Sequence, residues 1–285
     1  MDKPLKPEWL KIKVPFGPEY ARTRAVLASG GLHTICREGA CPNRSECWNA
    51  KTASFLILGS ICTRNCRFCN VSKNRNPDPV SPGEPEKLAE AVSCLGLKHV
   101  VITSVTRDDL PDGGALHFRR CIEAVRRRTP GTKVEILTPD FRNKPSALEV
   151  FQPARPDVFG HNIETVPRLY SSVRAAADYG CSLGLLEAFK KAFPEIPVKS
   201  GLMLGLGERE AEVRQVMADL RAAGTDLLTV GQYLRPSAEH FPVVRYVPPE
   251  EFDGYREEGL KMGFKAVVSG PFVRSSYRAA EVSAG

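Results

Sequence analysis

The feature that most constrains the fold is an alternation of short apolar runs with longer amphipathic stretches along most of the chain. The apolar runs have the length and branched-residue content of buried strands, and they lie at residues 54–59, 99–104, 134–138, 158–163, 199–205, 227–232 and 266–270. Helical periodicity fills the intervals, at residues 87–97, 117–127, 147–152, 165–176, 184–193, 210–224 and 249–263. Strands and helices in this order form βαβ units around a parallel sheet. About six such units predict an α/β fold, a partial (β/α)6-type TIM barrel whose site lies at the carboxyl ends of the strands.

The rest of the chain fits around one such domain. Its 285 residues, 42% of them hydrophobic, suffice to bury a large core. We expect an N-terminal extension at residues 1–50, the barrel at 51–265 and a C-terminal extension at 266–285. Residues 18–29 have the pattern of a helix, whereas residues 31–50 indicate a loop.

Charge and cysteine usage narrow the setting. The formal net charge of +7 suits an acidic partner, or equally an ordinary solvated basic surface. The first residues, MDKPLKPEWLKIKVP, include no apolar stretch, so we expect no secretory signal, and no apolar run is long enough to span a membrane. Nine cysteines without an export signal favour metal or redox chemistry over disulfides. We therefore expect a cytoplasmic protein.

The sequence CTRNCRFC at 62–69 directly follows the first strand and brings three cysteines together, Cys62, Cys66 and Cys69. Three thiolates at this spacing can hold three irons of a [4Fe–4S] cube and leave the fourth iron open. An open iron can bind the amino and carboxylate groups of a small molecule and pass it an electron. The alternative is a zinc knuckle with a distant fourth ligand, but zinc sites usually group their cysteines as C-x2-C pairs.

A second triad precedes the first. Cys36, Cys41 and Cys47, in CREGACPNRSECWNA, have the spacing C-x4-C-x5-C and also lack a fourth cysteine. The other cysteines, Cys94, Cys121 and Cys181, lie among apolar neighbours in helical patterns, where free cysteine is commonly a small buried hydrophobe.

CTRNCRFC after a strand of this kind resembles the radical S-adenosylmethionine (SAM) superfamily. The two triads together resemble the lipoyl synthase family, and the resemblance runs nearly the full length. Segments that carry it are TSVTRDDLPDGGA (103–115), VEILTPDF (134–141), HNIETVPRLY (161–170), KSGLMLGLGE (199–208), GQYLRPS (231–237), HFPVVRYVPPEEF (240–252) and RSSYRA (274–279). The chain departs from the family at VRAAADY (173–179), where the family usually has VRPGADY, which changes loop stiffness but no chemical group.

The resemblance implies two [4Fe–4S] clusters. Cys62, Cys66 and Cys69 would hold the one that binds and cleaves S-adenosyl-L-methionine. Cys36, Cys41 and Cys47 would hold an auxiliary cluster whose fourth ligand is a serine of RSSY. We assign that role to Ser276 rather than Ser275. Arg274 could hold a nearby anion or carbonyl, and Tyr277 could pack over the cluster. Without the resemblance, the same residues indicate an ordinary polar turn.

The resemblance also suggests residues that contact SAM. Asp112, Gly113 and Gly114 follow the second strand, although a glycine pair alone more often marks a turn. Asn162 and Glu164 are two residues apart, so a continuing strand places them on one face, where they suit ribose hydroxyls. Arg174 could neutralise a carboxylate. Gln232 and Leu234 could contact adenine. His161 alone indicates a satisfied core histidine, and Glu135 and Thr138 face the same site only in one barrel register.

The family's reaction inserts two sulfur atoms at C6 and C8 of a protein-bound octanoyl-lysine, with sulfur supplied by the auxiliary cluster, so the implied enzyme is a sulfurtransferase of lipoate biosynthesis. The implied partners are octanoylated lipoyl carrier domains (2-oxoacid dehydrogenase E2 subunits and the glycine cleavage H protein), a ferredoxin or flavodoxin electron donor and an iron–sulfur carrier protein. We expect no nucleic acid and no membrane partner. Two alternatives remain: a radical SAM enzyme that modifies tRNA, and a non-catalytic iron–sulfur or zinc scaffold.

Overall fold

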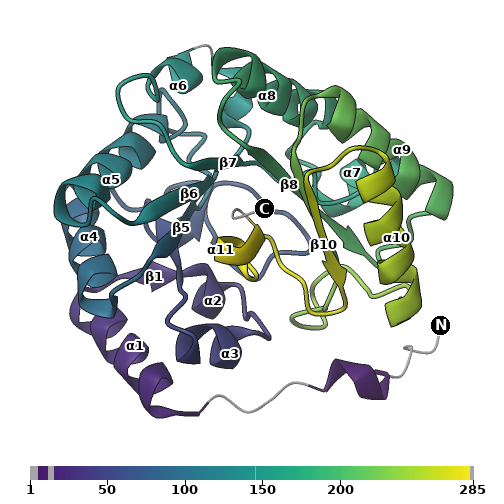
Figure 1. Ribbon diagram of the computed structural model, residues 1–285, viewed down its shortest axis with the longest axis horizontal. Coiled ribbons are helices and arrows are strands. Elements are labelled where there is room, and N and C mark those ends of the chain that lie inside the picture. Colours follow the sequence, from purple (N-terminus) through teal and green to yellow (C-terminus); the bar gives the residue numbers. More distant parts are fainter. Residues whose placement is uncertain (1–5, 12–15, 145, 283–285) are drawn as a thin grey trace. The chain divides into compact units, whose positions relative to one another are not determined.

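The computed structural model describes residues 6–11, 16–144 and 146–282 (Figure 1). Their contacts divide the chain into two compact units. The first-half unit comprises Lys13–Arg64 and Asn70–Phe159, and the second-half unit comprises Met1–Ile12, Asn65–Cys69 and Gly160–Gly285. The family resemblance also includes PEWLKIK at 7–13, of which residues 12–13 lie outside the described residues. The expected boundaries at residues 50 and 265 stay a prediction.

The first-half unit is built on a mostly parallel set of strands in the order β1-β2-β5-β6 (Figure 1). Strand β1 (His33–Thr34) is antiparallel to β2 (Ser54–Ile57), which is parallel to β5 (His99–Ser104). β5 is in turn parallel to β6 (Lys133–Leu137), and β7 (Val158–Gly160) follows in sequence. Every residue of β2 is buried, as the apolar sequence predicts for a strand covered on both faces.

Two amphipathic helices accompany these strands, α4 (Glu84–Leu95) and α5 (Ala115–Arg128). They pack against each other, and a buried contact of 2.7 Å between His117 Nε2 and Glu84 Oε2 joins them. Glu84 also accepts a hydrogen bond of 2.8 Å from the Leu58 amide. The predicted helix at residues 18–29 is confirmed as α1 (Pro18–Ser29). A short 3-10 turn, η2 (Phe141–Asn143), and α6 (Ser146–Glu149) complete the unit's later part.

The loop expected at residues 31–50 is wrong in part. Two short helices lie there, α2 (Ile35–Glu38) and α3 (Arg44–Asn49), and they carry two of the three cysteines of that region. The Thr34 side chain caps α2 by accepting a hydrogen bond from the Arg37 amide at 3.3 Å. Helices of one or two turns are too short to show a periodic pattern in a sequence. The capping residue Thr34 was the one sequence signal for α2.

The second-half unit holds three parallel strands in the order β8-β9-β10: β8 (Val198–Leu204), β9 (Leu227–Gln232) and β10 (Ala266–Gly270). Its longer helices are α8 (Tyr179–Ala192), α9 (Glu210–Ala222) and α10 (Pro249–Lys261). Shorter elements are η1 (Glu8–Leu10), η3 (Pro167–Leu169), α7 (Tyr170–Val173) and α11 (Ala279–Val282). The helix predicted at residues 165–176 is broken, since Pro167 begins a 3-10 turn and Arg174 leaves the helical region with φ −135°.

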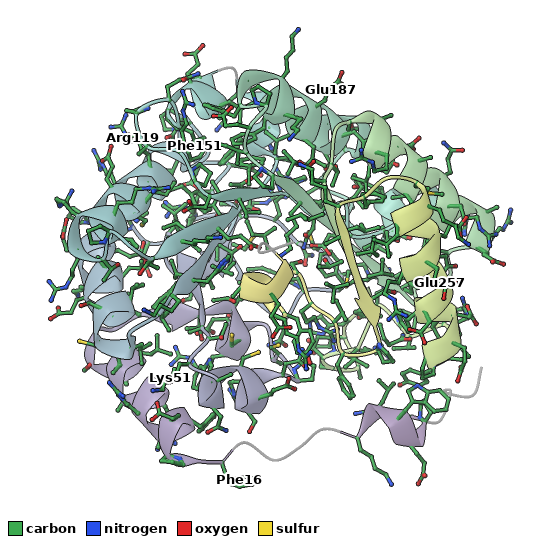
Figure 2. The ribbon with its side chains drawn as sticks, in the orientation of Figure 1. Phe16, Lys51, Arg119, Phe151, Glu187 and Glu257 are labelled. Atoms are coloured by element: carbon green, nitrogen blue, oxygen red, sulfur yellow. The ribbon has the colours of Figure 1, made fainter. Side chains whose placement is uncertain are left out.

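Side-chain burial follows the sequence pattern in both units. In the first-half unit Phe151 is fully buried, whereas in the second-half unit Glu187 on α8 and Glu257 on α10 are exposed and point away from the strands (Figure 2). Among the described residues, no helix is both long and apolar enough to cross a membrane.

Candidate active site

The first cysteine triad begins in a short strand fixed by the loop that follows β5. Cys62 ends β3 (Ile61–Cys62), which pairs with β4 (Ser72–Lys73). The Thr106 amide lies 3.4 Å from Cys62 Sγ, and the Arg64 amide lies 3.5 Å from it. Thr63 binds the Thr106 carbonyl with both its amide and its hydroxyl, at 3.0 and 2.9 Å. The Thr106 and Arg64 amides can donate hydrogen bonds to the sulfur when it is a cluster ligand.

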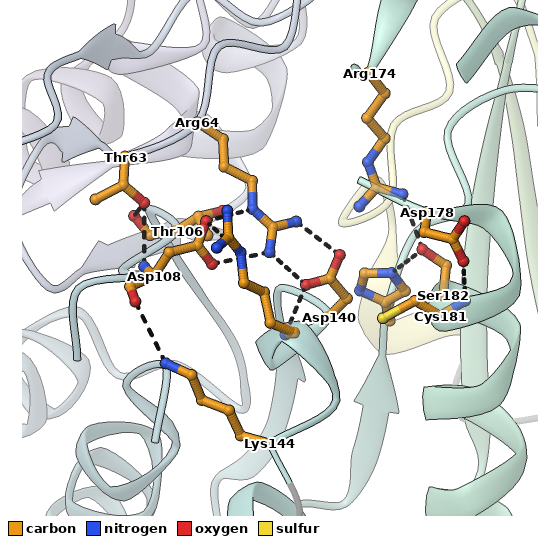
Figure 3. A network of polar contacts seen from close by, with 12 residues as sticks. Thr63, Arg64, Thr106, Asp108, Asp140, Lys144, Arg174, Asp178, Cys181 and Ser182 are labelled. Carbon is orange, nitrogen blue, oxygen red and sulfur yellow. Dashed lines mark hydrogen bonds and ion pairs between the residues drawn. The ribbon is translucent and has the colours of Figure 1, made fainter. Parts of the chain in front are cut away.

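A buried arginine holds this loop to the ends of two strands (Figure 3). The Arg64 guanidinium donates two hydrogen bonds to Asp108 (2.8 and 2.9 Å) and two to Asp140 (2.7 and 2.6 Å). The Arg64 and Asp140 side chains are 4% and 2% exposed, so water does not screen the pair. Burial lowers the pKa of Arg64, but the two carboxylates raise it by more, so the group stays charged.

The turn after β6 is shaped for this interaction. Phe141 and Arg142 have φ of +49° and +50°, in a region that non-glycine residues seldom adopt. The Arg142 amide donates to Asp140 at 2.9 Å, which fixes the carboxylate from its own turn. Backbone strain of this kind persists only where surrounding contacts over-determine it. We did not assign a role to Arg64, Asp108 or Asp140 from the sequence. The signal was present, because both carboxylates follow adjacent parallel strands.

Cys66 and Cys69 belong to the second-half unit. The Cys69 amide binds the Cys66 carbonyl at 3.2 Å, so the segment between them forms a tight turn. Arg67 in that turn binds the Val173 carbonyl through its amide at 2.9 Å, and accepts from the Phe241 amide at 2.9 Å. His240 Nε2 lies 3.1 Å from the Cys69 carbonyl oxygen. The backbone of the turn is thereby held, and the cysteine side chains project from a fixed frame.

The second triad lies on and between the short helices α2 and α3 of the first-half unit. Cys36 is buried in α2, Cys47 is in α3, and the Cys41 amide binds the Cys36 carbonyl at 3.1 Å. Burial, and to a smaller degree Cys41, raise the pKa of the Cys36 thiol to about 11, while the nearby Ser54 and Trp48 oppose the rise. Burial thus disfavours a free thiolate at Cys36.

Among the described residues, the cysteines form neither a disulfide nor a preformed metal-binding group. All nine cysteines are described, and none forms a disulfide, in agreement with the sequence prediction. Within the described ranges, no three His, Cys, Asp or Glu side chains already form a group able to hold a metal ion. The cluster ligands therefore stay predictions. The remaining cysteines divide: Cys121 is buried as expected, Cys181 is half-buried, and Cys94 is exposed, contrary to expectation.

The Asp112-Gly113-Gly114 turn has a local structural role. Asp112 accepts hydrogen bonds from the amides of Gly114 (2.9 Å) and Leu116 (2.7 Å), and so caps the start of α5. Gly114 has φ +93°, and a Cβ atom there would lie 2.4 Å from Leu58 Cδ1. Helix capping and close packing thus account for all three residues, and their contact with SAM stays a prediction.

Asn162 and Glu164 do come together. Asn162 Nδ2 lies 3.1 Å from Glu164 Oε1 and 2.5 Å from Ser275 Oγ. The expected reason was wrong, because β7 ends at Gly160 and Glu164 has φ +68°, so the strand does not continue. Glu164 instead forms an isolated bridge with Leu202. Removal from water raises the pKa of Glu164, against the opposing effects of Arg174, Asn162 and Arg274.

Asn162 also carries an orphaned acceptor. Its Oδ1 atom is buried and has no hydrogen-bond partner among the described residues. Buried acceptors of this kind are rare unless a ligand or water fills them. A carboxylate next to an unpartnered amide oxygen provides acceptors for a pair of hydroxyl donors, which is the pattern that a ribose presents.

Arg174 and the nearby polar residues contact other groups of the protein. Arg174 is buried, and its Nη1 donates to the Asn162 carbonyl and to Tyr170 Oη at 3.2 Å. It also donates to Ser182 Oγ at 3.2 Å (Figure 3). His161 Nε2 lies 3.0 Å from Ser182 Oγ, which confirms a satisfied core histidine. Glu135 is buried against His99, with 3.2 Å between Oε2 and Nε2, and Thr138 is buried.

Gln232 is committed to the backbone. Its Nε2 donates to the carbonyls of Leu204, Tyr233 and Arg245 at 3.0–3.2 Å, and its Oε1 accepts from the Val247 amide at 2.8 Å. The residue is 1% exposed. The Nε2 donors are thus used by the protein itself, and contact of Gln232 with adenine stays a prediction. Leu234, two residues on, is half-buried.

The RSSY turn packs on β9. A Cβ atom on Gly231 would lie 2.1 Å from the Val273 carbonyl oxygen, so glycine is required where the turn crosses the strand. The Tyr277 amide binds the Arg274 carbonyl at 2.9 Å, and Ser275 Oγ lies against Asn162. Ser275 and Ser276 are both half-buried. The turn therefore connects the RSSY motif directly to the Asn162–Glu164 pair.

Comparisons with known proteins assign this arrangement to a family. A model of the radical SAM superfamily matches residues 56–220. A lipoyl synthase of Nitrosococcus oceani is 56% identical over 281 residues, covering 98% of this chain and 86% of that protein. A lipoyl synthase of Anaeromyxobacter dehalogenans is 53% identical over 278 residues, covering 97% of this chain and 94% of that protein.

Solved structures agree on the fold. Methylornithine synthase (PylB) superposes with a TM-score of 0.58 at 14% identity, covering 87% of this chain and 74% of that one. Streptococcus suis SuiB bound to S-adenosylmethionine superposes with a TM-score of 0.56 at 12% identity, covering 79% of this chain and 53% of that one. The predicted α/β fold of the radical SAM class is thus confirmed. From the superfamily match and the identity across nearly its whole length, the chain belongs to the radical SAM superfamily and, within it, to the lipoyl synthase family.

Proposed function

We propose that this chain forms lipoyl groups by inserting sulfur at C6 and C8 of an octanoyl group carried in amide linkage on a protein lysine. The observation that carries the proposal is the 53–56% identity to lipoyl synthases over nearly the full length, in a chain that has two separate cysteine triads. One triad suffices for a radical SAM enzyme. The second triad therefore indicates a second cluster with a different role.

The first triad is the proposed site of the superfamily's [4Fe–4S] cluster and of SAM. When bound, these groups supply a 5′-deoxyadenosyl radical, which can remove hydrogen from an unactivated C–H bond. Cys62, Cys66 and Cys69 would be the three protein ligands, which leaves one iron open. The amides that already face Cys62 Sγ suit a metal-bound thiolate.

Residues of the second-half unit would hold the nucleoside. Glu164 and the orphaned Asn162 Oδ1 offer acceptors to ribose hydroxyls. Arg174 stands behind them as a buried cation and would offset a ligand carboxylate. Leu234 offers an apolar surface for adenine. Asp112, Gly113 and Gly114 would contact the methionyl part through their backbone, since the Asp112 side chain already caps α5.

The second triad is the proposed site of an auxiliary [4Fe–4S] cluster with Ser276 as fourth ligand. We further propose that this cluster is the sulfur source and is consumed. An alkoxide is a harder and less preferred iron ligand than a thiolate, so it can leave and expose an iron. Iron and sulfide remaining per chain after a single turnover test this proposal, and unchanged content after product formation contradicts it.

The two serines of RSSY allow a matched test of the fourth ligand. Ser276→Ala is expected to lower the iron content of the auxiliary cluster or its sulfur transfer, whereas Ser275→Ala removes the contact with Asn162. If the effects on the auxiliary cluster are reversed, the ligand is Ser275 and the assignment to Ser276 is wrong.

The proposed partners follow from the reaction. They are octanoylated carrier domains such as E2 subunits and the H protein, a ferredoxin or flavodoxin electron donor and an iron–sulfur carrier protein. The net charge of +7 favours acidic partners of this kind. A cytoplasmic location is part of the same proposal.

The direct test is anaerobic incubation of the reconstituted protein with SAM, a reductant and an octanoyl-lysine peptide, read by mass. The expected product has gained two sulfurs and lost two hydrogens, with 5′-deoxyadenosine released. Release of 5′-deoxyadenosine only with RNA present, and salt-dependent RNA binding, would support the tRNA-modifying alternative. No 5′-deoxyadenosine under any condition would indicate a scaffold rather than an enzyme.

A further inference from the structure

Trp48 is a buried aromatic residue with an unused hydrogen-bond donor. It lies in α3 directly after Cys47, and only 3% of its surface is exposed. Its Nε1 atom is buried and has no hydrogen-bond partner among the described residues. A buried indole N–H normally finds an acceptor, so this one requires an explanation.

The indole cannot easily turn to find an acceptor elsewhere. Its ring packs on Tyr20 with 5.0 Å between centroids and an angle of 31° between the planes. The Arg44 guanidinium lies over the ring at 5.8 Å from its centroid. The backbone is also held, because the Trp48 carbonyl lies 3.4 Å from Thr23 Oγ1. The direction of the N–H is therefore set by the packing of α1 against α3.

The indole lies beside the second triad. Trp48 directly follows Cys47 in α3. It is also close enough to Cys36, on α2, to lower the pKa of that thiol together with Ser54. A larger anionic acceptor on these cysteines would meet the donor where the lone thiol does not.

We propose that the Trp48 indole N–H donates a hydrogen bond to a sulfur of the cluster held by Cys36, Cys41 and Cys47, either an inorganic sulfide or the Cys36 Sγ. The inference rests on the proposed auxiliary cluster. Trp48 is a positioning residue that stabilises negative charge on cluster sulfur. Hydrogen bonds to sulfur make the reduction potential of a cluster less negative, and outer-shell partners strengthen metal retention.

The test compares Trp48→Phe with the wild type in a background of Cys62→Ala, Cys66→Ala and Cys69→Ala, where only the auxiliary cluster can form. Phenylalanine keeps an aromatic ring but has no N–H. With iron and sulfide content equal at the start, the variant is expected to show a more negative midpoint potential and about tenfold faster loss of iron to a chelator. Trp9→Phe is the matched control, because Trp9 is 44% exposed on η1 and should change neither quantity.

A second measurement separates this role from simple packing. In the cluster-free protein, Trp48→Phe loses ring packing on Tyr20 but also removes an unsatisfied donor, so the two effects on the free energy of unfolding oppose each other. In the cluster-loaded protein the lost hydrogen bond adds to the cost, so the variant's denaturant midpoint should fall further below that of the wild type than it does without the cluster. Equal potentials and equal iron loss in Trp48→Phe and wild type would overturn the inference while leaving the auxiliary cluster in place. A background protein that binds no cluster at all would overturn the proposed function, and the inference with it.

Discussion

At the scale of single residues, Glu164 shows a conflict between stability and binding. Removal from water raises its pKa, so the folded state disfavours its ionised form. The sign follows from linkage: for a group whose folded pKa is raised, its contribution is complete below the unfolded pKa and is lost as pH rises through the folded pKa. Because burial of this carboxylate is unfavourable for folding, we expect Glu164 to have a role in ligand binding.

Glu164→Gln tests this expectation. Glutamine cannot ionise, so the variant should be as stable as the wild type or more stable at pH 7, and this difference should vanish as pH falls toward about 4, the ordinary glutamate pKa. SAM binding should weaken about tenfold, because a charged acceptor for hydroxyl donors is lost. Denaturant unfolding against pH and equilibrium dialysis measure the two effects. Glu187→Gln, on the exposed face of α8, should change neither; a less stable Glu164→Gln variant at pH 7 contradicts the account.

Arg64 is the second residue-scale prediction. Arg64→Lys keeps the charge but loses the fork that bridges Asp108 and Asp140, which leaves buried carboxylate oxygens unpaired. We expect a loss of roughly 2–3 kcal/mol in the free energy of unfolding and a lower iron content at the first triad. Arg142→Lys provides the control, since Arg142 pairs with Asp108 but is 58% exposed and should cost less than about 1 kcal/mol. Equal losses in the two variants would argue against a clamp at Arg64.

The role of a residue could be predicted from the sequence only where its residue type has few alternative roles. Cysteines at a fixed spacing have few structural reasons to cluster, so both triads stood out. Gln232 and Asp112 are expected to contact a ligand, and the structure shows that both side chains also satisfy backbone groups. A polar side chain at the end of a strand can bind a ligand or satisfy a backbone group. Only its hydrogen-bond partners in the structure distinguish these two roles.

At the scale of elements, Asp226 fastens several pieces of the second-half unit. Its carboxylate contacts Lys190 Nζ on α8 at 2.8 Å, Lys265 Nζ before β10 at 3.0 Å and the Val198 amide of β8 at 3.0 Å. Burial raises its pKa, but the lysines and the amide lower it by more, so the pKa lies below its usual value. A lowered pKa means stability that is present above the unfolded pKa and lost as pH falls through the folded one.

Asp226→Asn should therefore cost about 1–2 kcal/mol at pH 6, after allowing for the partly exposed lysines. The gap to the wild type should narrow below about pH 4, the ordinary aspartate pKa, because the wild type then loses the same charge. Urea unfolding from pH 3 to pH 7 measures it. A gap that stays constant with pH would show that the carboxylate's charge has no part in holding these elements together.

Long elements were predictable and short ones were not. Each of the predicted strands exists, since apolar runs between helical patterns leave little choice. The region at residues 31–50 was expected to be a loop, but α2 and α3 place Cys36 and Cys47 on separate helices. The cause lies in contacts distant in sequence, such as the Tyr20 ring on Trp48. Propensity within so few residues carries no comparable signal.

At the scale of the whole molecule, the two cysteine triads have different proposed roles, SAM cleavage and sulfur supply. Full-length identity to lipoyl synthases assigns the family, and the chain's own hydrogen bonds show how parts of each triad are held. The fold class and the triads could be predicted from the sequence. The orphaned donors and acceptors at Trp48 and Asn162 could not, because an unmet hydrogen bond exists only once its surroundings are built.

The most direct measurement of this division is a comparison of three proteins in anaerobic turnover with SAM, a reductant and an octanoyl-lysine peptide: the wild type, a variant with Cys36, Cys41 and Cys47 replaced by alanine, and one with Cys62, Cys66 and Cys69 replaced. The account predicts 5′-deoxyadenosine and a doubly sulfurated peptide from the wild type. It predicts 5′-deoxyadenosine without added sulfur from the first variant, and neither product from the second. Sulfur insertion by the variant that lacks Cys36, Cys41 and Cys47 would contradict it.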